Sequence, residues 1–247
     1  MSAEARDRLL RARMLGERTL YRLRDRTEDA GAYRSPAGED AVEGDVFPEE
    51  GFVIGFDEAA WEEVREEALS CTKCDLCETR TQVVWGSGTP RTGLMCVGEA
   101  PGYHEDRKGE AFVGRAGALL TKILKAIGFE RDEVFITNVL KCRPPDNADP
   151  RPHQVEACEP YLQRQIELID PAVIMTLGRH AARTLLGQDG PMRSFRGRVF
   201  EYEGVPLVAT YHPAALLRNE KLKRPTWEDV QLARRVYDEE MEFRGGR

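Results

Sequence analysis

The chain is 247 residues long, carries a formal net charge of −7 and contains six cysteines. No apolar run reaches the roughly 20 residues that cross a membrane, and the charged N-terminus lacks the apolar stretch of a secretory signal. These features exclude an integral membrane protein and predict a cytoplasmic one. Because cytoplasmic thiols are normally reduced, the cysteines do not indicate a disulfide framework.

The negative charge is concentrated at the front of the chain. Residues 1–70 contain 10 Arg and 18 Asp and Glu, a net charge of −8, whereas residues 71–247 carry +1. A near-neutral region can still present a local basic face. The overall charge therefore does not exclude a protein that binds nucleic acid.

An extension over residues 1–57 precedes the expected core. Residues 3–26 carry apolar side chains at spacings typical of an amphipathic helix, and residues 28–57 are acidic and rich in Gly and Pro, as in a linker. Two interpretations stay open. The extension is either a solvated tether or a helix that docks an unidentified protein partner.

From residue 58 onward, helical and strand patterns alternate. This alternation predicts an α/β fold, a three-layer α/β/α domain over residues 58–247 with a central, mostly parallel four-stranded sheet, and we expect a monomer. The expected elements are a helix over 58–69, a strand over 94–97, a helix over 116–127, a strand over 134–139, a helix over 153–169, a strand over 172–177, a helix over 179–186, a strand pair over 200–202 and 205–210, and a final helix capped by Thr226 and ending at Phe243.

Four cysteines form two spaced pairs, Cys71 with Cys74 and Cys142 with Cys158. Two pairs close the ligand shell of one metal ion or one cluster, and their spacing does not distinguish zinc from iron–sulfur. A set of buried, unligated thiols is the remaining alternative. Cys77 is a spare or alternative ligand, and Cys96 lies within an apolar strand, where a small core residue is expected.

Polar residues follow the expected strands at the edge where sites of parallel sheets lie. The segment from Gly98 through Glu99 to Gly102 follows the first strand, and Asn138 ends the second. An Asn amide has a donor and an acceptor and can pair with a pyrimidine edge. His212 follows the last strand, held by the next residue, a proline, in a non-helical backbone. Phe112, between glycines, is either a stacking platform or a core residue.

Together these segments resemble the iron–sulfur family, family 4, of the uracil-DNA glycosylase superfamily. Four patterns agree in order and spacing between about residues 71 and 240: CxxC, GExPG with a downstream FVGxAG, TNxxKCRPP followed by ACxPYL, and HPAALLR. The resemblance implies removal of uracil from single- or double-stranded DNA by a monofunctional glycosylase. It also implies a 4Fe-4S cluster on Cys71, Cys74, Cys142 and Cys158.

The resemblance further implies a role for each residue of the site. Phe112 stacks on uracil, Asn138 binds its N3 and O4 edge, and His212 stabilises charge at O2. Glu99 orients the water, with Glu105 and then Asp106 as further candidates. Ala100 and Gly102 line the water side, Leu216 or Leu217 fills the vacated base stack, and Arg218 lies near phosphate.

Two other functions remain open at this stage. One is a DNA-damage sensor on the same scaffold that binds without hydrolysis. The other is a zinc-ribbon interaction protein whose glycosylase-like motifs are structural. Formation of abasic sites in uracil-containing DNA distinguishes an enzyme from a damage sensor. Iron and sulfide content distinguishes an iron–sulfur protein from a zinc-ribbon protein.

Overall fold

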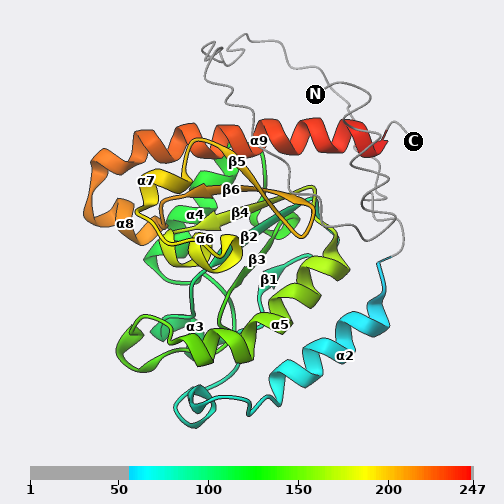
Figure 1. Ribbon diagram of the computed structural model, residues 1–247, viewed down its shortest axis with the longest axis vertical. Coiled ribbons are helices and arrows are strands. Elements are labelled where there is room, and N and C mark those ends of the chain that lie inside the picture. The colour runs from blue at the N-terminus through cyan, green and yellow to red at the C-terminus, as the bar shows by residue number, and fades with distance from the viewer. Residues whose placement is uncertain (1–55, 246–247) are drawn as a thin grey trace. The chain divides into compact units, whose positions relative to one another are not determined.

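The computed structural model describes residues 56–245 of the chain (Figure 1). The helix expected over 3–26 and most of the acidic linker therefore lie outside the described residues. The first described helix, α2 (Glu58–Leu69), begins where the core was expected, and the Asp57 carboxylate accepts a hydrogen bond from the Ala60 amide at 2.9 Å. Among residues 56–245, no helix combines the length and apolar character needed to cross a lipid bilayer.

The sheet has six strands in the order β1-β3-β2-β4-β6-β5. The four inner strands are mutually parallel, as expected, but an antiparallel strand is added at each edge, so the expectation of four strands was too small. The strands are β1 (Ser87–Gly88), β2 (Leu94–Gly98), β3 (Phe135–Asn138), β4 (Val173–Leu177), β5 (Val199–Tyr202) and β6 (Val205–Thr210).

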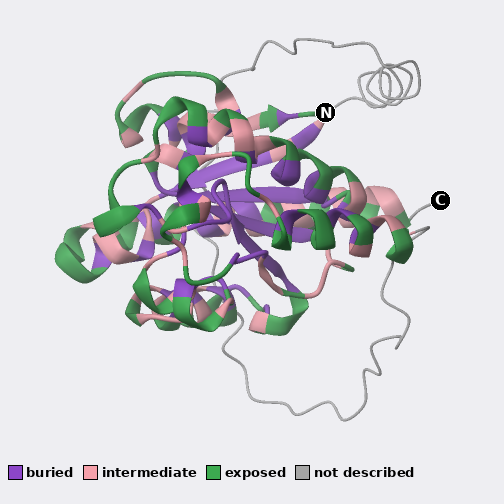
Figure 2. Cartoon of the chain, turned by 90° about the horizontal axis from the view of Figure 1, so that it is seen from below, coloured by how far each residue is buried: buried purple, intermediate pink, exposed green. Residues whose placement is uncertain are grey.

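Helices cover both faces of this sheet, because alternate side chains of a strand point to opposite faces. Met95 and Val97 of β2 pack into one hydrophobic cluster, whereas Leu94 and Cys96 pack into the other. The first cluster takes side chains from α2, α5 (Pro152–Ile169) and α6 (Arg179–Leu186). The second takes them from α4 (Arg115–Ala126) and α9 (Lys223–Gly245). Figure 2 shows the buried strands between the helical layers, which confirms the three-layer prediction.

The final helix begins earlier than predicted. α9 starts at Lys223, so Thr226 is a buried residue of its first turn and not the N-cap. Pro225 is tolerated there because the first amides of a helix have no intrahelical acceptor. Three short helices were not predicted as such: α3 (Tyr103–Lys108), α7 (Met192–Phe195) and α8 (Pro213–Arg218).

The carboxyl ends of the parallel strands meet at one edge of the sheet. Gly98 at the end of β2 pairs with Asn138 at the end of β3, and Leu177 of β4 pairs with Thr210 of β6. The ends of β2, β3 and β6 lead directly into segments that carry predicted site residues, whereas the end of β4 leads into α6, which carries none. The fold therefore brings the predicted motifs together at this edge, as expected for parallel α/β sheets.

Candidate active site and cysteine centre

The residues around Gly98 form a close cluster. A Cβ atom on Gly98 would lie 2.3 Å from Asn138 Oδ1 and 2.7 Å from two atoms of the Phe112 ring. The Phe112 and His212 rings are stacked, with centroids 5.4 Å apart and planes inclined by 30°. We call Phe112, Asn138 and His212 the Gly98 cluster. Only glycine permits this approach of the two side chains to the strand end.

Asn138 carries an unsatisfied acceptor in this cluster. The residue is 2 % exposed, and its side-chain Oδ1 is buried without a hydrogen-bond partner among the described residues. A buried acceptor without a partner costs about 1–3 kcal/mol, so such atoms are rare unless a ligand satisfies them. Oδ1 is therefore available to accept a hydrogen bond from a donor on a ligand.

Phe112 is held in an unusual backbone conformation. Its φ of 55° lies in the left-handed region, which is uncommon for an aromatic residue. The Glu105 carboxylate accepts hydrogen bonds from the Val113 and Gly114 amides at 2.9 and 3.1 Å, which holds the loop. Gly117 allows α4 to pack directly against the Phe112 backbone, since a Cβ on Gly117 would lie 1.7 Å from the Phe112 carbonyl oxygen. Strain of this kind gathers at functional sites.

His212 follows β6 and is the N-cap of α8. Its Nδ1 accepts a hydrogen bond from the Ala214 amide at 3.1 Å, so the neutral ring carries its proton on Nε2. Burial, with a smaller contribution from the Arg218 charge, lowers the pKa of His212 from 6.5 to about 4, against the opposing effect of Glu105. The ring is therefore neutral at pH 7 and offers an N–H donor.

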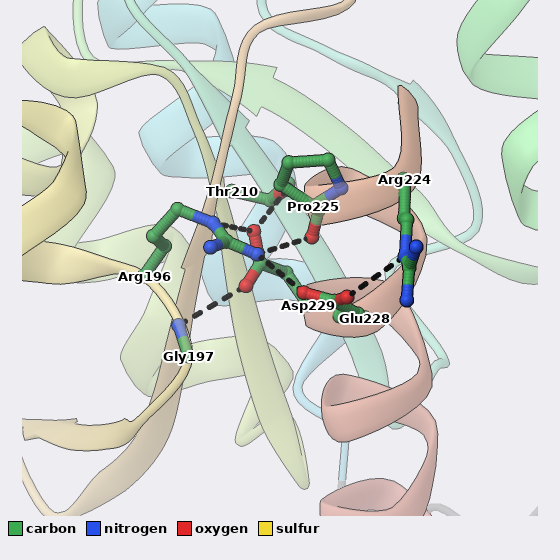
Figure 3. A network of polar contacts seen from close by, with 7 residues as sticks. All are labelled: Arg196, Gly197, Thr210, Arg224, Pro225, Glu228 and Asp229. Atoms are coloured by element: carbon green, nitrogen blue, oxygen red, sulfur yellow. Dashed lines mark hydrogen bonds and ion pairs between the residues drawn. The ribbon is translucent and has the colours of Figure 1, made fainter. Parts of the chain in front are cut away.

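The strand end before His212 is anchored by a buried carboxylate (Figure 3). Asp229 of α9 accepts hydrogen bonds from Thr210 Oγ1, from the Gly197 amide and from Arg196 Nε, each at 3.0 Å. Its side chain is fully buried. Burial raises the pKa of Asp229, while these three donors favour the charged form. The network joins α9 to the last residue of β6, two positions before His212.

Glu99 lies with two residues that the motifs did not indicate. Ligand atoms of Glu99, Asp149 and His180 all lie within 4.8 Å of one another. Burial raises the pKa of Glu99, Asp149 raises it further, and His180 and Arg179 oppose both effects. His180 follows β4 at the same edge, a position from which it could have been predicted. Asp149 comes from a loop whose path no local pattern specifies.

The HPAALLR segment contains the short helix α8, with His212 as its N-cap. Proline at the first helical position, Pro213, favours this start. Leu216 is 2 % exposed and packs inward, whereas Leu217 is 43 % exposed. Of the two residues expected to enter the DNA, only Leu217 is thus presented to solvent. Arg218, at the end of α8, is exposed as well.

The four predicted ligand cysteines line one cavity. Cys71 follows α2, Cys74 begins a short 3-10 helix, Cys142 follows β3 and Cys158 lies in α5. We call these four residues the cysteine quartet. All six cysteines of the chain are free thiols, so no disulfide competes for them.

Donors point at the sulfurs of this cavity. Arg80 Nη1 donates to Cys142 Sγ and the Lys141 amide donates to Cys158 Sγ, both at 3.2 Å. Such donors stabilise sulfur in its charged, ligating state. Burial raises the pKa of the Cys158 thiol to about 11, so a positive ion or cluster is needed to hold this residue as a thiolate.

Comparison with known proteins places this fold and site in a class. The Uracil DNA glycosylase superfamily matches residues 85–232, and the chain belongs to that superfamily. Within it, the chain is 46 % identical over 184 residues to the Type-4 uracil-DNA glycosylase of Sulfurisphaera tokodaii, covering 71 % of this chain and 84 % of that protein.

The type-4 assignment is supported by a second type-4 relative and by the lower identity to a type-5 relative. The Type-4 uracil-DNA glycosylase of Archaeoglobus fulgidus is 47 % identical over 178 residues, with 69 % of this chain and 89 % of that protein covered. The Type-5 uracil-DNA glycosylase of Pyrobaculum aerophilum is only 33 % identical over 154 residues, with 53 % and 68 % covered. The family indicated by the motifs is thereby confirmed.

Proposed function

We propose that this chain is a monofunctional uracil-DNA glycosylase. It rotates a deoxyuridine out of DNA, hydrolyses the bond between uracil and deoxyribose, and leaves an abasic site for base-excision repair. The observation that carries this proposal is the Gly98 cluster, in which an aromatic ring, a buried amide with an orphaned oxygen and a neutral imidazole meet at one strand end.

Uracil supplies what the orphaned Asn138 oxygen lacks. Its N3–H donates to Oδ1 while its O4 accepts from the amide Nδ2, so both halves of the amide are used. Cytosine has an acceptor at N3 and an amino donor at C4, and both oppose this arrangement. Phe112 gives the base a face to stack on. The rings of Phe112 and His212 are too close to hold a base between them, so the base takes the other face of Phe112 or displaces the imidazole.

In the proposed reaction, His212 acts on the leaving uracil and Glu99 acts on the attacking water. Water adds to C1′ as the C1′–N1 bond breaks, and the electron pair leaves with uracil. The His212 Nε2–H stabilises the negative charge that develops at O2. Glu99 orients the water, takes up its proton and stabilises the cationic sugar. We prefer Glu99 to Glu105, whose Oε1 already accepts two backbone hydrogen bonds.

Helix α8 presents the groups that act on the duplex. Rotating a nucleotide out of the stack costs a few kcal/mol, least at a U·G mismatch. Leu217, the exposed leucine, fills the vacated space, and Arg218 contacts a phosphate. Leu216 has a structural role, since it packs into the protein.

The cysteine quartet holds a 4Fe-4S cluster. In a tetrahedral zinc site, Zn–S bonds of about 2.3 Å place the sulfurs about 3.8 Å apart. Among the described residues, one set of three metal-ligating side chains has all its ligand atoms within 4.8 Å of one another, and that set contains no cysteine. The four thiols of the quartet nevertheless line one cavity. This wider spacing favours a cluster over one zinc ion. When bound, the cluster supplies covalent cross-links between α2, β3 and α5, and the reaction requires no electron transfer.

We also infer where the enzyme acts, its oligomeric state and the role of its N-terminal extension. The substrate places the enzyme with DNA in the cytoplasm, at the nucleoid. It acts as a monomer, and residues 1–57 serve as a tether or dock a protein partner.

The proposed function is tested by excision of uracil. The purified chain is incubated with U·G, U·A and single-stranded uracil oligonucleotides, and abasic sites are cleaved by alkali and counted. We expect strand cleavage at uracil on these substrates and none at thymine in matched T·G and T·A controls. Tight binding of uracil DNA without release of the base would instead identify a damage sensor.

A further inference from the structure

Lys141 is a buried cation that the proposed chemistry does not use. It is 2 % exposed, and its Nζ donates to Thr137 Oγ1 and to the Asn138 carbonyl oxygen at 2.7 Å each, and to Gln165 Oε1 at 2.6 Å. These three acceptors use every proton of the ammonium group, and an ammonium group has no lone pair with which to form a Schiff base.

The acceptors around Lys141 are themselves held in place. Thr137 Oγ1 and Gln165 Nε2 both donate to the Trp85 carbonyl oxygen, at 2.9 Å each. The three short hydrogen bonds are complete only in the ammonium form. A buried network in which every polar group is satisfied is rigid. Lys141 is therefore confined to one position in the core.

The same residue touches the cysteine quartet. Its backbone amide donates to Cys158 Sγ at 3.2 Å, and the next residue in the chain is Cys142. Lys141 thus contacts the peptide of Asn138 through its side chain and a cysteine sulfur through its backbone. The Asn138 side chain lies close against the end of β2, since a Cβ built on Gly98 would fall 2.3 Å from its Oδ1.

We propose that Lys141 is a positioning residue that holds the Asn138 amide for base recognition and joins it mechanically to the cysteine quartet. This inference rests on the proposed function. The ammonium group grips the Asn138 carbonyl, which fixes the peptide from which the recognising amide projects. Displacements of about 1 Å reduce the efficiency of an oriented site on the order of 100-fold.

The test measures base preference apart from turnover. Affinity is determined for a duplex with 2′-fluoro-deoxyuridine, which resists cleavage, and for the same duplex with thymidine. The variants are Lys141→Met, which keeps the length of the side chain but removes its donors, and Gln165→Leu. Gln165 bonds to Lys141, Thr137 and Trp85, and an effect of Gln165→Leu on base preference reaches Asn138 through this network. Iron content and melting temperature are measured alongside.

Ile166→Ala is the matched control, because Ile166 is a buried residue next to Gln165 in α5 and has no polar side-chain atoms. We expect Lys141→Met to lower the ratio of uracil to thymine affinity about 10- to 100-fold. Gln165→Leu lowers it less, and Ile166→Ala lowers only the melting temperature. Unchanged ratios in folded Lys141→Met and Gln165→Leu overturn the inference.

Gln165→Leu alone decides the question if Lys141→Met fails to fold or loses iron. A lowered ratio in that variant supports the positioning role, and a native ratio overturns it. A ratio near one in the native protein overturns the proposed function itself, which is a failure distinct from that of Lys141.

Discussion

Single residues of the Gly98 cluster are held in states that favour a ligand over the free protein. Asn138 Oδ1 has no hydrogen-bond partner within residues 56–245, Phe112 has a φ of 55°, and burial keeps His212 neutral. Each of these states costs free energy in the free protein, and we expect it to be relieved or used when the proposed substrate base binds. In the proposed enzyme, this local destabilisation at one strand end pre-organises the site for its substrate.

Asn138→Asp is the substitution that tests recognition. An ionised carboxylate cannot donate to uracil O4 and is buried without a partner, so we expect uracil excision to fall about 10- to 100-fold, corresponding to roughly 1–3 kcal/mol. A protonated carboxyl can accept from the cytosine amino group, so weak cytosine excision is expected. Single-turnover rates on U·G and C·G duplexes measure both.

Asn147→Asp is the control for this change, since it alters an exposed loop residue whose Oδ1 accepts from Arg143. We expect it to leave excision near the native rate. If Asn138→Asp excised uracil as fast as this control, Asn138 would have no part in recognition.

We expect the pKa of His212 to set the acid limit of the proposed excision activity. A depressed pKa means that the folded protein resists protonation while the unfolded chain accepts a proton below about 6.5. The contribution of His212 to stability is therefore complete above pH 6.5 and is lost as the pH falls through about 4. Excision should stay insensitive to this group from pH 7 to pH 5. NMR titration of the His212 ring checks this, and a midpoint near 6.5 would contradict it.

Helices and strands are held to one another by buried polar networks as well as by apolar packing. The Asp229 network joins α9 to the end of β6 and to the turn before β5 (Figure 3). β6 leads into His212, so the orientation of the imidazole depends on a carboxylate from a distant helix. The network adds to the pairing of Thr210 with Leu177 of β4, which also holds this strand end.

Asp229→Ala should destabilise the protein by about 3 kcal/mol, because it leaves Arg196 and the Gly197 amide without their buried acceptor. Excision should fall as well, through the displaced strand end. Chemical denaturation measures the loss. Arg224→Ala is the control in the same network, since its contact with Glu228 is long, at 3.7 Å, and Arg224 is 91 % exposed. A loss of less than about 0.5 kcal/mol is expected there.

The whole domain is stabilised around two clusters, one on each face of the sheet. Ligation of the proposed cluster by the cysteine quartet would add a second kind of connection, between the segment after α2, the segment after β3, and α5. Ligation across such sequence distances constrains the unfolded chain more than contacts between neighbours do. The cluster we propose would therefore stabilise the face of the domain that supports Asn138.

Cys142→Ala should bleach the brown colour of the protein and lower its melting temperature by several degrees. Cys77→Ala, which removes a thiol of the same cavity outside the quartet, should retain colour, iron and stability. Visible absorption, iron analysis and thermal unfolding distinguish the two. Loss of iron in Cys77→Ala with retention in Cys142→Ala would reverse the ligand assignment.

The sequence by itself determined the parallel core, the strand ends and the four thiols of the cavity. Apolar runs such as 94–97 and 172–177 are strands buried on both faces, and such strands place the residues that follow them at one edge. Gly98, Asn138 and His212 could be predicted to meet on that basis alone. The CxxC pair likewise depends only on local spacing.

Only the tertiary structure decided where neighbouring side chains point. Leu216 faces inward and Leu217 outward because α8 is helical, and Glu105 braces a loop instead of facing the water side alone. Lys141 shares a motif with Asn138, but its role depends on Gln165 in α5. Local patterns record periodicity, whereas these outcomes depend on contacts between segments far apart in the chain, which no window of sequence contains.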